Sequence, residues 1–293
     1  MSVERLKQRP PRSWLFVPAL KAPEWLGKAI ATGADAIIVD LEDATAPDEK
    51  ERAREVVAGL RLPAEPVVVV RVNPSPPELE GDVPAAVRAG AQGVVLPKVE
   101  GPWQVRRCAA FLEEAGGAHL AILPMIESPR AVLRALDIVD ADTRVASLMF
   151  GGGDLSAVAG LQRTQSGDEL TTARALIVLA ASAAGIGAVD TPWLDIKDPA
   201  GARDEAAKVR DMGFTGKFAI HPSHVAAIHE GFVPSAEQVA DARGLIEAFE
   251  RGLAAGTGVT TYKGRMIDRP DALQAERLLA RAGRGKGAET TQL

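Results

Sequence analysis

Two carboxylate residues follow apolar runs at neighbouring places along the chain and are suited to holding a metal ion. Glu127 lies near the end of PMIES, and Asp154 ends FGGGD, the next such segment. Two carboxylates can bind Mg²⁺ while water and substrate oxygens fill its other octahedral positions. Zinc is less natural, because His221 is the one histidine that follows such a run and Cys108 is the sole cysteine. The sequence therefore predicts a magnesium site.

A basic residue follows each of two other apolar runs. Arg71 closes VVVVR, and its planar guanidinium matches both oxygens of a substrate carboxylate. If Arg71 is buried it also needs a partner, and the nearby acids can serve as one. Lys98 follows VVLP, and a Schiff-base aldolase uses a lysine as its nucleophile. The preferred interpretation of Lys98 is an ion-pair partner for the acids or a helper for Arg71.

The segment DLED places three acids, Asp40, Glu42 and Asp43, after another apolar run. They can orient waters that are bound to a metal ion. The alternative is that they cap a helix or form ion pairs with Arg52 and Arg54.

Glycines precede Asp154 in FGGGD. Gly152 and Gly153 let the backbone come close to a bound ligand, so both are predicted to contact substrate. The loop is also compatible with phosphate binding, and a plain tight turn explains it equally well.

The elements that must position these residues alternate between short apolar runs and amphipathic helices. Several runs lack polar alternation, which is typical of strands covered on both faces. Eight β-α units over about 210 residues favour an α/β fold of the (β/α)8 TIM barrel type, which typically needs ~250 residues. A doubly wound open sheet is the main alternative, but no glycine fingerprint follows the first run. The runs begin at Ser13, Ala36, Val67, Gly93, Ala121, Val145, Gly185 and Lys217.

In a barrel, the carboxyl ends of the strands meet on one face, where barrel enzymes carry their active sites. The polar residues that follow the runs are expected to gather there. For any one of them the alternative is that strands end where water begins. These residues are Asp40, Glu42, Asp43, Arg71, Asn73, Lys98, Glu127, Asp154, Asp190 and His221.

The chain is predicted to divide into four parts. They are an N-terminal arm (1–12), the catalytic barrel (13–233), a C-terminal helical lid or oligomer arm (234–283) and a disordered tail (284–293). Within the extension, Ser235 and Gln238 have the spacing of a capping box at the start of a helix. The glycine- and threonine-rich stretch 252–264 is expected to be extended or mobile.

Composition and charge exclude several classes of protein. The 293 residues are 46% hydrophobic and 25% charged, which is globular rather than disordered or collagen-like. A net charge of −5 argues against nucleic acid as a partner. One cysteine excludes an intrachain disulfide, and neither a signal peptide nor an apolar stretch of bilayer length is present. We expect a cytoplasmic protein with no membrane or nucleic-acid partner.

The motifs and their order resemble those of the citrate lyase β-subunit-like family, part of the wider HpcH/HpaI aldolase group. The matching segments run from Ser13 to about Ala282 and are LFVP, GADAIIVDLEDA, VVRVN, VVLPKVE, IES, FGGGDL, AIHP and KGRMIDRP. The resemblance implies a (β/α)8 barrel with a C-terminal lid, usually a homotrimer, that acts on carbon–carbon bonds with Mg²⁺.

The resemblance also implies roles for single residues. Glu127 and Asp154 look like the two direct metal ligands, and Arg71 is similar to the arginine that grips the carboxylate of a 2-oxo acid. Asp268, in GRMIDRP, looks like the catalytic lid aspartate that one subunit inserts into the site of its neighbour. From the residues alone, Asp268 would be the N-cap of a helix before Pro270.

The implied reaction is retro-Claisen cleavage of a 3-hydroxyacyl-CoA of the malyl-, methylmalyl- or citramalyl-CoA type to a 2-oxo acid and an acyl-CoA. Lys21 and Lys28 are the cations where coenzyme A phosphates approach in relatives. Because Glu24 and Trp25 stand where relatives often carry basic residues, an aldolase for a free 4-hydroxy-2-oxo acid is the first alternative. A non-catalytic subunit that binds an acyl-CoA or an organic acid is the second.

Overall fold

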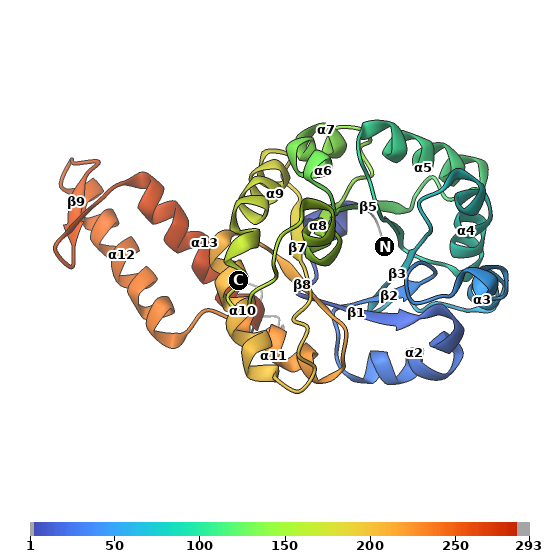
Figure 1. The fold of residues 1–293 in the computed structure, drawn as a ribbon. Coiled ribbons are helices and arrows are strands. Elements are labelled where there is room, and N and C mark those ends of the chain that lie inside the picture. Colours follow the sequence, from blue (N-terminus) through green and yellow to red (C-terminus); the bar gives the residue numbers. More distant parts are fainter. Residues whose placement is uncertain (1–2, 286–293) are drawn as a thin grey trace. The chain divides into compact units, whose positions relative to one another are not determined.

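The computed structural model describes residues 3–285 and contains a closed barrel of parallel strands (Figure 1). Each strand pairs with the next one along the chain, and the last pairs with the first. The strands are β1 (Ser13–Pro18), β2 (Ala36–Asp40), β3 (Val67–Arg71), β4 (Gly93–Leu96), β5 (Ala121–Ile126), β6 (Ser147–Phe150), β7 (Gly187–Asp190) and β8 (Gly216–Ala219). The predicted (β/α)8 TIM barrel is therefore confirmed.

Helices connect the strands and surround the barrel (Figure 1). The chain must return to the same edge after each parallel strand, and a helix on the outer face makes that crossover. The helices of this part are α1 (Val3–Gln8), α2 (Ala22–Ala31), α3 (Lys50–Gly59), α4 (Pro76–Ala89), α5 (Pro102–Glu114), α6 (Pro129–Leu133), α7 (Ala135–Val139), α8 (Gly152–Ala159), α9 (Thr171–Ala183), α10 (Pro199–Met212) and α11 (Ser223–Phe232).

Two strands begin later than their apolar runs do. Val145 makes only an isolated bridge to Ile122, and β6 proper begins at Ser147. Gly185 has a φ of 66°, the left-handed conformation that follows the end of α9, so β7 begins at Gly187. In both cases the local turn, rather than the apolar pattern, decides where the ladder starts.

Alternate strand residues fill the interior of the barrel. Trp14, Ile38 and Leu123 belong to one buried cluster there, as expected when successive side chains point to opposite sides of a strand. Leu6 of α1 joins the same cluster and is 3% exposed. Burying a leucine stabilises by about 1.5–3 kcal/mol. Helix α1, which belongs to the segment 1–12 predicted as an arm, thus contributes to the barrel core.

The chain divides into two compact units, Met1–Ile228 and His229–Leu293. The second unit contains helix α12 (Ala236–Ala254), the antiparallel strands β9 (Thr260–Tyr262) and β10 (Arg265–Ile267), and helix α13 (Arg269–Gly285). Its own small core consists of Ala248, Phe249, Ile267 and Ala272.

The structure tests several local features that the sequence predicts for the second unit. The capping box of Ser235 and Gln238 is present, which confirms that prediction. The stretch 252–264 includes β9, so part of it is a hairpin strand. Helix α13 continues to Gly285, and the rest of the predicted tail (284–293) lies outside the described residues. The predicted lid role of 234–283 stays a prediction.

Among residues 3–285, no helix is long and apolar enough to cross a bilayer.

Candidate metal and carboxylate site

The closed barrel brings the ends of β2 to β6 to one face, and the predicted polar residues lie at these ends. Asp40 and Arg71 are register partners on β2 and β3. Glu127 directly follows β5, whose last residue Ile126 pairs with Phe150 at the end of β6. Residues far apart in sequence therefore become neighbours because parallel strands share one polarity around the barrel.

Arg71 is 8% exposed and is held by acids at the end of β2. Its Nε and Nη2 donate to the two carboxylate oxygens of Asp40 at 2.7 and 2.6 Å, and its Nη1 lies 2.9 Å from Oε2 of Glu42. Burial acts to lower the pKa of Arg71, but the hydrogen bonds and charge of Asp40 and then the charge of Glu42 outweigh it, so the pKa is raised. The guanidinium stays charged, with its Nη groups still carrying protons beyond the bonds to Asp40.

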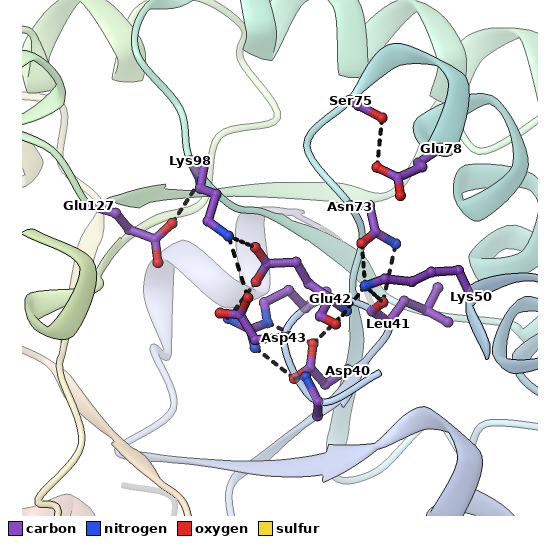
Figure 2. A network of polar contacts seen from close by, with 12 residues as sticks. Asp40, Leu41, Glu42, Asp43, Lys50, Asn73, Ser75, Glu78, Lys98 and Glu127 are labelled. Carbon is purple, nitrogen blue, oxygen red and sulfur yellow. Dashed lines mark hydrogen bonds and ion pairs between the residues drawn. The ribbon is translucent and has the colours of Figure 1, made fainter. Parts of the chain in front are cut away.

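Lys98 joins the acidic residues to Glu127 (Figure 2). Its ammonium donates to Oε1 of Glu42 at 2.5 Å and to Oδ1 of Asp43 at 3.4 Å, while its backbone N–H donates to Oε2 of Glu127 at 2.7 Å. The φ of Lys98 is 52°, an unusual left-handed conformation for a residue with a side chain. In this conformation the backbone N–H points to the carboxylate of Glu127, while the side chain reaches the carboxylates of Glu42 and Asp43.

The charge state of Lys98 favours the ion-pair interpretation over the Schiff-base one. Burial acts to lower its pKa, but the hydrogen bond and charge of Glu42, followed by the charge of Asp43, raise the pKa above its ordinary value. A Schiff base requires the neutral amine as nucleophile. An ammonium held by two carboxylates is therefore a poor candidate for that chemistry.

The alternative pairing of the DLED acids with Arg52 and Arg54 is wrong. Arg52 pairs with Glu49 in the same helical turn, and Arg54 pairs with Asp82 of α4. Helix α3 packs beside α4 on the outside of the barrel, so these arginines reach partners there. The acids pair instead with the cations at the ends of β3 and β4.

The helix-capping alternative for Asp40 is wrong, because its backbone bonds lie in the loop after β2 and not at the start of a helix. Its Oδ1 accepts from the N–H of Glu42 at 2.9 Å, and its Oδ2 accepts from the N–H of Ala44 at 3.3 Å. These bonds shape the loop after β2 while the same carboxylate holds Arg71. Asp40 thus links the loop conformation to the position of the guanidinium.

Lys50 is a supporting residue that the sequence analysis missed. Its ammonium donates to the carbonyls of Leu41 and Glu42 at 2.7 and 2.6 Å and to Oδ1 of Asn73 at 2.7 Å (Figure 2). One feature of the sequence could have indicated this role: Lys50 lies at the start of the helix that follows the DLED loop. Three acceptors from two loops keep the backbone of Glu42 in one position.

Glu127 is a buried carboxylate without an ion-pair partner among the described residues. It is 3% exposed and accepts only the backbone bond from Lys98. Burial first, and then repulsion from Asp154 and Glu42, raises the pKa of Glu127 to about 8. Arg71 acts in the opposite direction but more weakly. A buried acid in this state gains from an added positive charge.

Asp154 lies in the first turn of α8 and is half-buried. The glycines before it differ in their surroundings. A Cβ at Gly151 would overlap the carboxylate of Glu127, whereas a Cβ at Gly153 would meet no atom within 4 Å. Gly152 is buried, and a Cβ there would lie 3.0 Å from Leu170. Gly153 therefore borders open space, while Gly152 faces protein.

These donors fit a hard divalent cation. Glu127 and Asp154 have only oxygen donors, interact electrostatically and form no ion pair with Lys or Arg within residues 3–285. No cluster of three or more His, Cys, Asp or Glu suited to a metal occurs in that range. Two carboxylates that leave the remaining positions to water and substrate are the arrangement that Mg²⁺ favours. Oε2 of Glu42 is buried and lies 2.9 Å from Nη1 of Arg71, so Glu42 belongs to the same charge network as the guanidinium.

The remaining predicted residues are not brought into this network. Lys21 ends the turn after β1, and Lys28 lies further along α2; both are exposed. Asp268 belongs to the second unit and directly precedes α13. Its backbone N–H donates to Oδ2 of Asp271 at 3.0 Å, so Asp271 caps this helix start. The predicted roles of Lys21, Lys28 and Asp268 stay predictions.

We expect Mg²⁺ binding to strengthen with pH because Glu127 must lose its proton to bind. Below its pKa of about 8 the metal displaces that proton, so the dissociation constant should fall about tenfold per pH unit and then level off. Titration calorimetry between about pH 6 and 9 measures this dependence. A dissociation constant that does not change over this range would contradict the assignment of Glu127 as a ligand.

Known proteins share this fold and sequence over nearly the whole chain. Residues 12–222 match the family model HpcH/HpaI aldolase/citrate lyase. The chain is 35% identical to the citrate lyase subunit beta of Escherichia coli strain K12 over 291 residues, covering 96% of both proteins. It is 32% identical to the L-malyl-CoA/beta-methylmalyl-CoA lyase of Cereibacter sphaeroides strain ATCC 17029 over 304 residues, covering 94% of this chain and 95% of the lyase.

Solved structures agree with this relationship. The protein CitE from Mycobacterium tuberculosis, crystallised with magnesium, acetoacetate and coenzyme A, superimposes with a TM-score of 0.80. It is 34% identical, and the alignment covers 94% of this chain and 99% of that one. The same protein has also been crystallised with magnesium and pyruvate, at a TM-score of 0.73. The chain therefore belongs to the HpcH/HpaI aldolase/citrate lyase family.

Proposed function

We propose that the protein cleaves a 3-hydroxyacyl-CoA of the malyl-, methylmalyl- or citramalyl-CoA type into a 2-oxo acid and an acyl-CoA, with Mg²⁺ as cofactor. The protein is a carbon–carbon lyase of its family. The observation that carries the proposal is the pair of carboxyl groups, Glu127 and Asp154, that form no ion pair within residues 3–285 and lie in the field of the Arg71 guanidinium. Such a site can hold a metal and an α-hydroxy or α-oxo carboxylate side by side.

Glu127 and Asp154 would hold the metal ion. When bound, Mg²⁺ supplies positive charge to the hydroxyl or keto oxygen and the adjacent carboxylate of the substrate. Glu42, which Lys98 and Arg71 hold in place, would accept a hydrogen bond from a water in this site. The chain thus contributes two ligands and a rigid acceptor beside them.

Arg71 would hold the carboxylate of the 2-oxo acid half. Asp40 binds both Nε and Nη2, so the guanidinium cannot rotate, and its remaining Nη protons are directed away from that carboxylate. A pre-oriented fork loses little freedom when it binds two oxygens and keeps the breaking bond in a reactive geometry. The ion pair with Glu42 then links the position of the substrate to the metal-site residues.

Proton transfer at the acyl carbon is assigned to Asp268. A base removes the substrate hydroxyl proton, the carbon–carbon bond breaks, and the electron pair forms a thioester enolate. Asp268 would donate a proton to the enolate carbon, or remove one in the reverse, Claisen direction. The motif GRMIDRP supports this assignment.

Asp268→Asn is expected to lower kcat by about 10²–10⁴-fold, the usual contribution of a general acid or base. The dissociation constant for Mg²⁺ should not change, because Asp268 is not proposed as a ligand. Steady-state kinetics and metal titration of the same preparation check both parts. Full activity in this variant would remove Asp268 from the mechanism.

Coenzyme A use is proposed from the exposed Lys21 and Lys28 and from the family. The related CitE structure contains coenzyme A, and the Cereibacter sphaeroides relative is a malyl-CoA lyase by name. Glu24 and Trp25 are also exposed on α2 and reduce the basic character there. This observation favours the second candidate, a Mg²⁺-dependent aldolase for a free 4-hydroxy-2-oxo acid. A homotrimer and a cytoplasmic location stay predictions.

One assay separates the candidates. Glyoxylate or pyruvate release is measured from malyl-CoA, citramalyl-CoA and a free 4-hydroxy-2-oxo acid, with Mg²⁺ and with EDTA. We expect release from a CoA thioester at roughly 1–10³ turnovers per second with Mg²⁺, the usual enzyme range. Release only from the free acid would support the aldolase. No release from any substrate would favour a non-catalytic subunit that binds an acyl-CoA or an organic acid.

A further inference from the structure

Four ionised side chains outside the proposed chemistry are buried beside β7 and β8. Asp190, Lys217 and Arg174 are fully buried, and Glu205 is 8% exposed. Arg174 donates two hydrogen bonds to Asp190, at 2.8 and 3.0 Å, and Lys217 Nζ lies 2.7 Å from both Asp190 and Glu205. Two positive and two negative charges balance here. Because apolar side chains would avoid the desolvation cost, stability alone gives no reason for this charge cluster.

The charge cluster holds the chain where it leaves β7. Besides its carboxylate partners, Lys217 donates to the backbone carbonyl of Thr191 at 2.6 Å. Thr191 follows Asp190 directly and is 2% exposed. An ammonium with three acceptors in fixed positions leaves the Thr191 peptide little freedom. The cluster therefore determines where the Thr191 side chain lies.

Thr191 in turn contacts the start of α8. Its Oγ1 accepts from the backbone N–H of Gly152 at 3.3 Å. A Cβ at Gly152 would lie 3.1 Å from that same oxygen, so the two residues are closely packed. Gly152 is the first residue of α8, and the first N–H groups of a helix have no partner within it.

Helix α8 lacks a cap of its own. Its N-cap position is Gly151, which makes no side-chain capping bond. Any larger residue at 151 would overlap the carboxylate of Glu127. A serine or threonine at the N-cap would accept from the second or third N–H of the helix. Thr191, directly after β7, instead supplies an acceptor for the first N–H, that of Gly152, and leaves space for Glu127.

We propose that Thr191 is a positioning residue for Asp154, and that Lys217 and the buried charge cluster keep Thr191 in place. The inference rests on the proposed function, since it takes Asp154 as a metal ligand. Asp154 is in the first turn of α8, so its carboxylate moves with the helix start that Thr191 holds. Mg²⁺ requires near-ideal octahedral geometry, and ligands must lie within about 0.5 Å of their productive positions.

The test is direct binding of Mg²⁺ alone, measured by calorimetry on the full chain. Thr191→Val removes the acceptor oxygen at nearly constant shape and is expected to raise the dissociation constant about tenfold or more, as loss of a supporting bond does elsewhere. Thr191→Ser keeps the oxygen and should bind within about twofold of the unsubstituted protein. Thr215→Val is the matched control, because it makes the same chemical change directly before β8. The hydroxyl of Thr215 donates to the carbonyl of Ala188 in β7 at 3.0 Å.

The outcomes separate the inference from the proposed function. Weaker binding by Thr191→Val, with Thr191→Ser and Thr215→Val near normal, supports the inference. If Thr191→Val binds Mg²⁺ as tightly as the unsubstituted protein, the inference is overturned while the proposed function stands. The same holds if Thr191→Ser or Thr215→Val binds Mg²⁺ as weakly as Thr191→Val. Absence of Mg²⁺ binding in the unsubstituted protein overturns both. If Thr191→Val does not fold, Thr191→Ala removes the same oxygen without adding a methyl group and is judged by the same criteria.

Discussion

Glu127→Gln is expected to remove Mg²⁺ binding and carbon–carbon cleavage while the barrel stays folded. Glutamine keeps the shape and still accepts the 2.7 Å bond from the backbone of Lys98, but it offers the metal no negative charge. We expect the Mg²⁺ dissociation constant to rise at least about a hundredfold, because a direct ligand matters at least as much as a supporting one. Calorimetry with Mg²⁺ and the 2-oxo acid release assay measure these effects.

The same variant should change how stability depends on pH. The pKa of Glu127 is about 8 in the folded protein and 4.5 in an unfolded chain. Between these values the unfolded chain has lost the proton that the folded protein keeps, so stability falls as pH rises from about 4.5 to about 8. Glutamine does not titrate, and this part of the dependence should disappear.

Urea unfolding at about pH 5 and pH 8 compares Glu127→Gln with Glu114→Gln, which changes an exposed glutamate on α5. The control should resemble the unsubstituted protein in binding, activity and pH dependence. If Glu127→Gln retains metal-dependent turnover, Glu127 is not a ligand and the proposed mechanism is wrong.

Arg71→Met is expected to have the largest effect on stability of any single substitution in this site. It leaves Asp40 and Glu42, 2% and 3% exposed, without the guanidinium that neutralises them. Removing one partner of a buried ion pair costs about 3–5 kcal/mol. Substrate orientation would be lost as well, so cleavage should be abolished even in protein that remains folded.

The matched control is Arg52→Met, the same chemical change at a side chain that is 71% exposed and paired with Glu49. An exposed ion pair of this kind contributes about 0–1 kcal/mol. The free energy of unfolding in urea, measured for both variants, gives the comparison. A loss below about 1 kcal/mol for Arg71→Met would show that the acids have other compensation.

The sequence alone determined the barrel and the face on which its polar strand-end residues lie. Apolar runs of strand length with helices between them require a layer of helices outside a parallel sheet. Each polar residue that follows such a run then lies on the carboxyl face of the barrel. Glu127, Asp154 and Arg71 could be chosen on that basis, because their place depends on strand order and not on fine geometry.

Only the tertiary structure decided which charges meet. The sequence offers four possible cationic partners for the acids of DLED, namely Arg52, Arg54, Arg71 and Lys98. The spacing along the chain does not exclude pairing with Arg52 and Arg54. Closure of the barrel placed Arg71 and Lys98 beside the acids and directed the helix arginines outward. The spacing of residues along one helix does not predict which strands lie next to the strand that carries the acids.

The support for Asp154 shows the same division more strongly. The sequence marked FGGGD, but nothing local in it indicates that Thr191, 39 residues after Gly152, accepts the first N–H of α8. Lys217, which fixes Thr191, is 26 residues further again. Such contacts come from the circular order of strands, which brings β6, β7 and β8 together. A linear pattern predicts which residues are candidates for the chemistry, whereas the three-dimensional packing decides which other residues contact and support them.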